Sequence, residues 1–213
     1  MHDLLIFDCD GVLVDSERLS HAVLQQMLAE QGVHLSFDAT VERFIGTSLP
    51  VCMARIAELL DGRRPPGLDE QLAQRTRAAF EAQLQAVRGV EALLDALRSP
   101  CCVASNGNRA KVEFTLGHTG LLTRFAGRIF TAEDVAQPKP APDLFLHAAR
   151  CMGVAPQHST VVEDTPTGIA AAKAAGMRAI GFTAMTPPRR LVDAGADALA
   201  GSMDELAALL GTR

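Results

Sequence analysis

The chain has 213 residues, which allows one main hydrophobic core and a second small module, because domains typically hold roughly 100 to 200 residues. Hydrophobic residues make up 48% and charged residues 21%, a composition typical of a folded globular protein. The net charge of −5 gives no electrostatic reason to expect nucleic-acid binding. No apolar run approaches the ~18 residues of a membrane span, and the first residues lack a basic segment and a cleavage site, so we expect a cytoplasmic protein with no membrane partner.

The cysteine pattern favours neither a disulfide framework nor a structural zinc site, because the cysteines are odd in number and form no C-x-x-C pair. They are Cys9, Cys52, Cys101, Cys102 and Cys151. Cys9 lies between Asp8 and Asp10. Since successive side chains of a strand point to opposite faces, we expect Cys9 to pack in the core while its two neighbours face the other way.

The first predicted element is a strand at residues 4–7, which leads into the stretch FDCDGVLVDSE. The apolar run LLIF is typical of a strand that is covered on both faces. Gly11 allows the backbone to turn sharply past the strand end. Asp15 and Ser16 are interpreted as the start of the helix that follows.

Residues 16–88 show helical periodicity and no convincing strand. Apolar side chains recur at three- and four-residue steps in three segments, at 21–33, 48–60 and 70–87. The segment DGRRPPG at 61–67 is predicted to be a loop. We therefore predict an all-helical insertion after the first strand.

Strand-like runs return after the insertion. Four short apolar segments predict further strands at residues 101–105, 128–131, 160–163 and 178–182. Helical stretches separate these segments, and strand and helix in alternation indicate a parallel α/β sheet with right-handed crossovers.

Two of the intervening helices carry clear start and stop signals. Pro142 is predicted at the first helical position of one helix, with Gly153 just past its end. Thr165 is predicted to cap the other helix, with Pro166 first and Gly176 stopping it.

The predicted fold is α/β, with a Rossmann-like parallel-sheet core domain formed by residues 1–15 and 89–213 and an inserted all-α helical cap domain at 16–88. In an open parallel sheet, ligands bind outside the carboxyl ends of the strands, near the point at which the strand order reverses. An insertion after the first strand would sit above these strand ends.

Polar side chains are predicted at several of the strand ends and in one loop. They are Asp8, Asp10, Ser105, Asn106, Lys139, Glu163 and Asp164. Four carboxylates at one sheet edge would repel one another and raise some of their pKa values unless a cation intervenes. Hard oxygen ligands without a histidine cluster suit Mg²⁺. Lys139 and the Ser105 hydroxyl would then complete a pocket for a phosphate.

The two aspartates after the first strand suit phosphoryl transfer. An aspartate carboxylate can accept the phosphoryl group and split the reaction into two steps. A second carboxyl group can protonate the leaving alkoxide and then activate water. Asp8 and Asp10 fit these two roles because alternate strand positions face the same side.

This combination resembles the haloacid dehalogenase superfamily over nearly the whole chain. FDCDGVLVDSE is similar to the first motif of that family, VASNG to the second, KPAPD to the third and VVEDTPTGIAAAKAAGM to the fourth. The helical insertion after the first motif resembles the subgroup with a small helical cap, which contains β-phosphoglucomutase and many sugar-phosphate phosphatases. The region LLDALRSPCCVASNG is most similar to phosphatases of the 6-phosphogluconate type.

The resemblance implies a role for each of the polar residues above. Asp8 would be the nucleophile and Asp10 the general acid and base. Asp164, Asp8 and the main-chain carbonyl of Asp10 would hold Mg²⁺, and Glu163 would support the metal directly or through water. The phosphate would be bound by Ser105, Asn106 and Lys139.

Four further residues are candidates for substrate contact. They are His21, Arg75, Arg77 and Arg109. In β-phosphoglucomutase a cap histidine lies where this chain has Ser20, so His21 should face elsewhere unless the register shifts, and a packed or solvated histidine is favoured. A solvated helix face is likewise the favoured interpretation of the two cap arginines, and a surface position that of Arg109.

We therefore expect a Mg²⁺-dependent phosphatase, a phosphoric monoester hydrolase, that acts on a small phosphorylated metabolite such as a sugar or sugar-acid phosphate. The first alternative is a mutase of the β-phosphoglucomutase type, although the cap arginine of that enzyme aligns with Leu49 here. The second is a signalling receiver that accepts a phosphoryl group on an aspartate. The sequence leaves the substrate and the oligomeric state open, with a monomer favoured.

Overall fold

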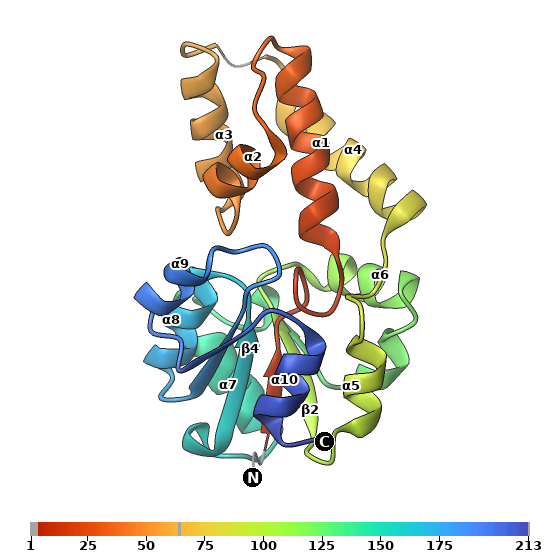
Figure 1. The fold of residues 1–213 in the computed structure, drawn as a ribbon, viewed down its shortest axis with the longest axis vertical. Coiled ribbons are helices and arrows are strands. Elements are labelled where there is room, and N and C mark those ends of the chain that lie inside the picture. The colour runs from red at the N-terminus through yellow and green to blue at the C-terminus, as the bar shows by residue number, and fades with distance from the viewer. Residues whose placement is uncertain (1–3, 64, 213) are drawn as a thin grey trace. The chain divides into compact units, whose positions relative to one another are not determined.

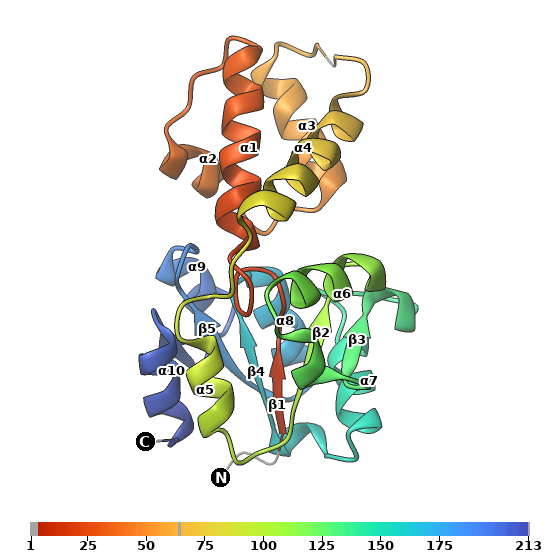
Figure 2. The same cartoon turned by 90° about the vertical axis from the view of Figure 1, so that its right-hand side faces the viewer.

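The computed structural model describes residues 4–63 and 65–212 and divides into two compact units. The first, here called the sheet unit, comprises Met1–Asp15 and Gln85–Arg213, and the second, the helical unit, comprises Ser16–Leu84. Figures 1 and 2 show the strands and their surrounding helices in the first unit and helices alone in the second.

The sheet unit contains a six-stranded parallel sheet, which confirms the predicted α/β fold. The order of the strands is β3-β2-β1-β4-β5-β6, so the chain builds outward from β1 first to one side and then to the other. Their bounds are β1 Leu4–Phe7, β2 Cys101–Ser105, β3 Ile129–Thr131, β4 Ser159–Glu163, β5 Arg178–Phe182 and β6 Ala198–Ala200. The last strand was not predicted, because its three residues, Ala-Leu-Ala, carry no β-branched side chain.

Six α-helices and three 3₁₀ turns of the described residues accompany the sheet. They are α5 Val90–Ala96, α6 Arg109–His118, η1 Leu122–Phe125, η2 Ala132–Asp134, α7 Asp143–Cys151, η3 Pro156–His158, α8 Pro166–Ala174, α9 Pro188–Asp193 and α10 Met203–Leu210. The predicted start of α8 is confirmed, since the Thr165 side chain accepts a hydrogen bond from the Gly168 N–H and Pro166 is the first helical residue. Pro142 instead precedes α7 as its cap residue.

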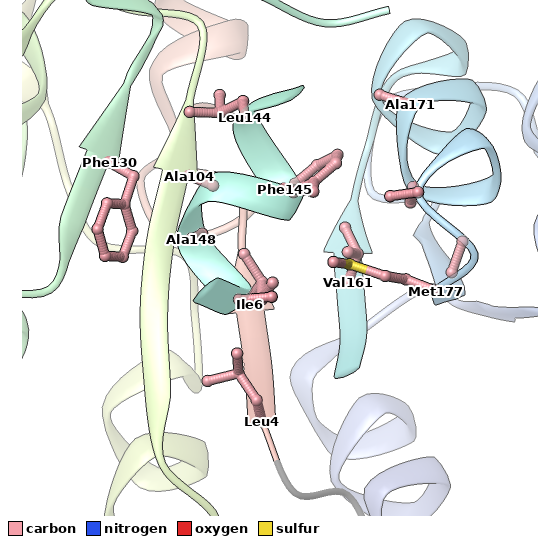
Figure 3. Packing of buried hydrophobic residues seen from close by; sticks show 14 of the residues in the cluster. Leu4, Ile6, Ala104, Phe130, Leu144, Phe145, Ala148, Val161, Ala171 and Met177 are labelled. Carbon is pink, nitrogen blue, oxygen red and sulfur yellow. The ribbon is translucent and has the colours of Figure 1, made fainter. Parts of the chain in front are cut away.

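Helices α7 and α8 cover one face of the sheet (Figure 3). Leu4 and Ile6 of β1 lie in one buried cluster with Phe145 and Ala148 of α7 and with Val161 of β4. All five side chains are fully excluded from solvent. Burial of a large apolar side chain contributes roughly 1.5–3 kcal/mol relative to leaving it exposed, so this cluster fixes the strand ends that carry the polar residues.

The helical unit has its own hydrophobic cluster. Its helices are α1 Ser16–Glu30, α2 Phe37–Phe44, α3 Leu49–Leu59 and α4 Leu68–Gln83. Leu28, Phe44 and Ile56 lie in this cluster and are almost completely buried. The three- and four-residue apolar spacing in the sequence thus corresponds to helix faces that pack on one another.

Backbone hydrogen bonds link the segment after α4 to the segment after β1. The Asp15 N–H donates to the Gln85 carbonyl over 2.9 Å, and the Val87 N–H donates to the Leu13 carbonyl over the same distance. These backbone bonds join the segment after α4 to the segment after β1, a long-range pairing that has no local sequence signal.

None of the helices in the described ranges 4–63 and 65–212 has the length and apolar character needed to cross a bilayer.

Candidate active site

The candidate site lies at the carboxyl ends of three adjacent strands. β1 is flanked by β2 and β4, and Phe7, its last residue, is in register with Val103 on one side and Val162 on the other. Asp8 follows Phe7 directly, so it emerges between the ends of the two neighbouring strands. The reversal of strand order at this point is where open α/β sheets bind ligands.

Lys139 is the centre of the polar cluster. Its ammonium group donates to Asp8 Oδ1 over 2.7 Å, to Glu163 Oε1 over 2.8 Å and to the Ala104 carbonyl over 2.7 Å. All three donor positions of the ammonium group are therefore used. The Phe145 ring lies below it, with its centroid 4.7 Å from Nζ. The fold thus brings Lys139, from the loop before α7, into contact with the carboxylates of Asp8 and Glu163.

Burial and crowding shift the pKa values of this cluster. Burial raises the pKa of Asp8 to about 7, the nearby Glu163 and Asp10 charges add to the rise, and Lys139 opposes it. Burial alone would lower the pKa of Lys139, but the Asp8 and Glu163 charges outweigh it and raise that pKa above its usual value. Lys139 therefore stays protonated. Its positive charge does not offset the burial and the neighbouring negative charges that raise the pKa of Asp8.

Glu163 is held in one orientation by the start of α8. Its Oε2 accepts hydrogen bonds from the Thr165 N–H over 2.9 Å and from the Thr165 hydroxyl over 2.8 Å. A Cβ atom on Gly168 would lie 1.8 Å from Glu163 Oε1, so only glycine leaves room for this carboxylate. Packing against Glu163 thus explains why Gly168 of the fourth motif is a glycine.

The side chain of Asn106 faces the Lys139 main chain. Its Nδ2 donates to the Lys139 carbonyl over 3.0 Å, and its Oδ1 accepts from the Lys139 N–H over 3.0 Å. The sequence predicts that Asn106 binds phosphate; in the structure the Oδ1 atom and one N–H of the Nδ2 atom hold the loop.

Ser105 occupies the end of β2 as predicted. Its side chain is buried, and its hydroxyl oxygen accepts a hydrogen bond from the Gly107 N–H over 3.1 Å. The hydroxyl hydrogen remains available to donate to an anion, because an oxygen that accepts one bond keeps its own donor.

Lys111 contacts Asp10 and is not among the site residues predicted from the sequence. Its ammonium group lies 2.7 Å from Asp10 Oδ2. Asn108 caps α6 by accepting a hydrogen bond from the Lys111 N–H over 2.8 Å, which places Lys111 in the first turn of the helix. The sequence signal for Lys111 is its position three residues after Asn108, the helix cap that follows the end of β2.

Asp164 follows the last residue of β4 and is 2% exposed, and Asp8 is 7% exposed. Among the residues that the structure describes, no three His, Cys, Asp or Glu side chains are grouped so as to hold a metal ion by themselves. Mg²⁺ usually takes only one or two carboxylates and completes its shell with waters and phosphate oxygens. Asp8 and Asp164, two buried carboxylates that directly follow the neighbouring strands β1 and β4, fit such an ion as oxygen ligands.

Arg109 is engaged away from this cluster. Its Nη2 atom lies 2.9 Å from Asp134 Oδ2, and its Nη1 donates to the Ile129 carbonyl over 3.3 Å. These contacts tie the start of α6 to β3 and the turn after it. Arg109 thus joins two elements of the sheet unit with a partly exposed side chain, in agreement with the surface position that the sequence favoured.

His21 of α1 is buried and is also engaged within its own helix. Its Nδ1 lies 2.7 Å from the Glu17 carbonyl, which can only accept, so Nδ1 carries the proton. Burial lowers the pKa of His21. The packed histidine favoured by the sequence is the one found.

The two cap arginines form ion pairs on the helical unit. Arg75 of α4 contacts both carboxylate oxygens of Glu30 at 2.7 and 2.8 Å, and Arg77 contacts Glu81 of its own helix at 2.9 Å. Both pairs are largely exposed, in agreement with the solvated helix face that the sequence favoured.

Cys9 packs as predicted. It is fully buried, and its Sγ lies 3.7 Å from the Thr115 hydroxyl of α6. Burial raises the pKa of the thiol well above its usual value, so Cys9 is not a thiolate nucleophile.

Known proteins are similar to this chain in sequence and in fold. The family model for haloacid dehalogenase-like hydrolases matches residues 2–176. The 6-phosphogluconate phosphatase of Escherichia coli strain K12 is 33% identical over 184 residues, which cover 85% of this chain and 83% of that protein. A conserved haloacid dehalogenase-like protein of unknown function from Agrobacterium tumefaciens superposes with a TM-score of 0.93, at 36% identity and with 99% and 98% of the two chains covered. A hydrolase of the same family from Deinococcus radiodurans, solved with bound phosphate and sodium, gives a TM-score of 0.85 at 33% identity, with 99% and 96% covered.

Proposed function

The chain belongs to the haloacid dehalogenase-like hydrolases, and from that premise we propose that it is a phosphatase of small phosphorylated metabolites. The substrate would be a sugar or sugar-acid phosphate, and the reaction would pass through an aspartyl phosphate on Asp8. The observation that carries the proposal is the Lys139 ammonium group held 2.7 Å from Asp8 at the sheet edge. A fixed cation beside a carboxylate nucleophile neutralises the charge that otherwise repels it from a phosphate.

In the first step the Asp8 carboxylate attacks phosphorus, and the bond from phosphorus to the substrate oxygen breaks. Asp10, as the carboxylic acid, gives its proton to the leaving alkoxide. In the second step the Asp10 carboxylate takes a proton from water, whose oxygen attacks phosphorus. The bond from phosphorus to Asp8 then breaks, which restores the Asp8 carboxylate and releases inorganic phosphate.

The remaining residues bind and orient the phosphate. The Ser105 hydroxyl would donate to its oxygens, and Lys139 would do so by exchanging one of its three present acceptors for a phosphate oxygen. Lys111, 2.7 Å from Asp10 Oδ2, orients the carboxyl group that moves the proton. These charges are fixed before the substrate arrives, so little reorganisation is needed during the reaction.

The resident metal is proposed to be Mg²⁺. Asp8, Asp164 and the main-chain carbonyl of Asp10 would hold it, with Glu163 nearby. When bound, the ion would supply the positive charge that keeps the Asp8 carboxylate ionised and that neutralises the phosphate oxygens. Removal of divalent metal with a chelator should abolish turnover, and added Mg²⁺ should restore it. Full activity in excess chelator would contradict a metal requirement.

The helical unit is proposed to act as a cap that contributes specificity and excludes bulk water. This role rests on the family membership and on the insertion point after β1.

A screen of phosphorylated metabolites tests the proposal. The purified protein would be incubated with Mg²⁺ and each of a set of sugar phosphates, sugar-acid phosphates and nucleotides, with released phosphate as the readout. The first compound to include is 6-phosphogluconate, because the relative of that name is 33% identical. Phosphate release from sugar or sugar-acid phosphates is expected, and no release from any of them would overturn the proposal.

The mutase alternative shares the four core motifs. The two reactions differ in whether water or a sugar hydroxyl attacks the phospho-enzyme. Conversion of β-glucose 1-phosphate to glucose 6-phosphate in the presence of a bisphosphate activator, measured in a coupled assay, would favour the mutase. Leu49, an exposed apolar residue at the start of α3, is the aligned position at which that enzyme has its arginine, which favours the phosphatase.

A further inference from the structure

The carboxamide of Asn106 makes a two-bond clamp on the main chain of Lys139. The carbonyl oxygen of the amide accepts from the Lys139 N–H, and the amide nitrogen donates to the Lys139 carbonyl, both over 3.0 Å. Only one of the two possible orientations of the amide satisfies both bonds, since the acceptor must face the N–H and the donor the carbonyl. The side chain thus satisfies both the N–H and the carbonyl of Lys139, as a neighbouring strand does in a β-sheet.

The clamp joins two segments of the chain that have no regular structure in common. Asn106 directly follows β2, whereas Lys139 lies in the loop before α7. Pro138 and Pro140 flank the lysine, and a proline has no N–H to donate. The Lys139 N–H is therefore a rare donor in this part of the loop, and Asn106 is its partner.

The clamp matters because Lys139 has a long and flexible side chain. Ordering such a side chain costs up to roughly 2 kcal/mol of conformational entropy. The Asn106 amide fixes the main-chain end, and the opposite end is held by Asp8, Glu163 and the Ala104 carbonyl. With both ends fixed, the ammonium group keeps its place beside Asp8 when a phosphate competes for it.

We propose that Asn106 is a positioning residue that acts on the phosphate through Lys139 rather than by contact with the phosphate. This inference rests on the proposed function for its effect on phosphate binding. The clamp itself is a property of the sheet unit and does not depend on the reaction.

The clamp is tested first by hydrogen exchange in the full chain without ligand. Asn106→Ala should speed exchange of the Lys139 amide by roughly fivefold or more, the effect of losing one hydrogen bond. Peptides that cover residues 137–141 are informative, because the two prolines contribute no amide. Ser202→Ala removes a comparable cap bond in α10, from the Glu205 N–H to the Ser202 hydroxyl, and should leave Lys139 exchange unchanged. Unchanged exchange in Asn106→Ala would overturn the clamp.

The route of action is tested by equilibrium binding of inorganic phosphate in the presence of Mg²⁺. Asn106→Ala should weaken binding about tenfold when Lys139 is present and less than about twofold in a Lys139→Met background, because residues that act through one another are not additive. An equal loss in both backgrounds would mean that Asn106 contacts the anion itself and would overturn the proposal. Ser202→Ala should bind phosphate like the native protein.

The two tests separate this inference from the proposed function. A native protein that neither binds phosphate nor hydrolyses phosphomonoesters would overturn the proposed function. The exchange measurement would still show whether the Asn106 amide protects the Lys139 N–H. It needs only the single variant Asn106→Ala, so it can be made even if Lys139→Met fails to fold.

Discussion

Lys139 and the two carboxylates beside it are all nearly excluded from solvent, so each charge depends on the others. The lysine has three hydrogen-bond partners, and both of its charged partners raise its pKa. Asp8 receives one ammonium group but lies near further negative charge, which leaves its pKa at about 7. Asp8, the proposed nucleophile, is thus costly to ionise in the protein without metal, and an additional cation beside it would stabilise its carboxylate form.

The raised pKa of Asp8 predicts how stability depends on pH in the presence of a chelator. Between pH 4 and 7 the folded protein binds a proton at Asp8 that the unfolded chain has released, so the contribution of Asp8 to the free energy of unfolding falls as pH rises through this range. Asp8→Asn removes this contribution. The rise in pKa from 3.8 to about 7 corresponds to at most about 4 kcal/mol.

Thermal unfolding of the native protein and of Asp8→Asn would be compared at about pH 4.5 and about pH 8, which lie below and above the raised pKa of Asp8. The variant should gain several degrees over the native protein at the higher pH and little at the lower one. A difference in unfolding temperature that is the same at both values would contradict the assignment of the raised pKa to Asp8.

At the scale of the element, the start of α8 holds Glu163 through a cap and a glycine. Thr165 caps the helix with its hydroxyl oxygen and donates the hydroxyl hydrogen to Glu163. Gly168, one turn later, leaves the space that the carboxylate fills. Thr165 and Gly168 therefore serve both the start of the helix and the orientation of the Glu163 carboxylate that faces Lys139.

Gly168→Ala should displace Glu163, since the added Cβ would meet its carboxylate at 1.8 Å. We expect a loss of stability of about 1–3 kcal/mol and at least a tenfold loss of kcat/KM. Gly117→Ala in α6 is the matched control, because its Cβ would meet only Leu122 at 3.7 Å. That variant should be up to about 1 kcal/mol more stable than the native protein, with unchanged kinetics. Equal effects of the two alanines on unfolding and turnover would contradict the packing argument.

Local patterns were enough to predict most of the strands and the cap of α8. The short apolar segments and the Thr165-Pro166 pair act within a few residues, and the structure confirms them. Strand β6, at 198–200, is too short for such a pattern. The pairing of Asn106 with the main chain of Lys139 could not be predicted, because only the folded sheet brings these two residues together.

At the scale of the whole molecule, each of the two units encloses its own hydrophobic cluster. The sheet unit is built around the strands and α7 and α8, and the helical unit around residues of α1 to α4. A unit with its own core can in principle lose structure while the other keeps it. We propose on this basis that residues 16–84 form a domain.

Leu28→Ala tests this proposal, because Leu28 is 2% exposed and lies in the cluster of the helical unit. Removal of a buried leucine side chain should cost about 2–5 kcal/mol within that unit. Hydrogen exchange should then quicken in α1 to α4 and stay slow in β1, β2 and β4. Equal loss of protection in helices and strands would indicate a single cooperative unit.

The most direct test of the central claim is phosphate release by the native protein and by Asp8→Asn, with Mg²⁺ and the best substrate of the metabolite screen. We predict repeated turnover by the native protein and release at background by the variant, with the same circular dichroism spectrum for both. A folded Asp8→Asn protein that retains a substantial part of the native turnover would contradict Asp8 as the nucleophile.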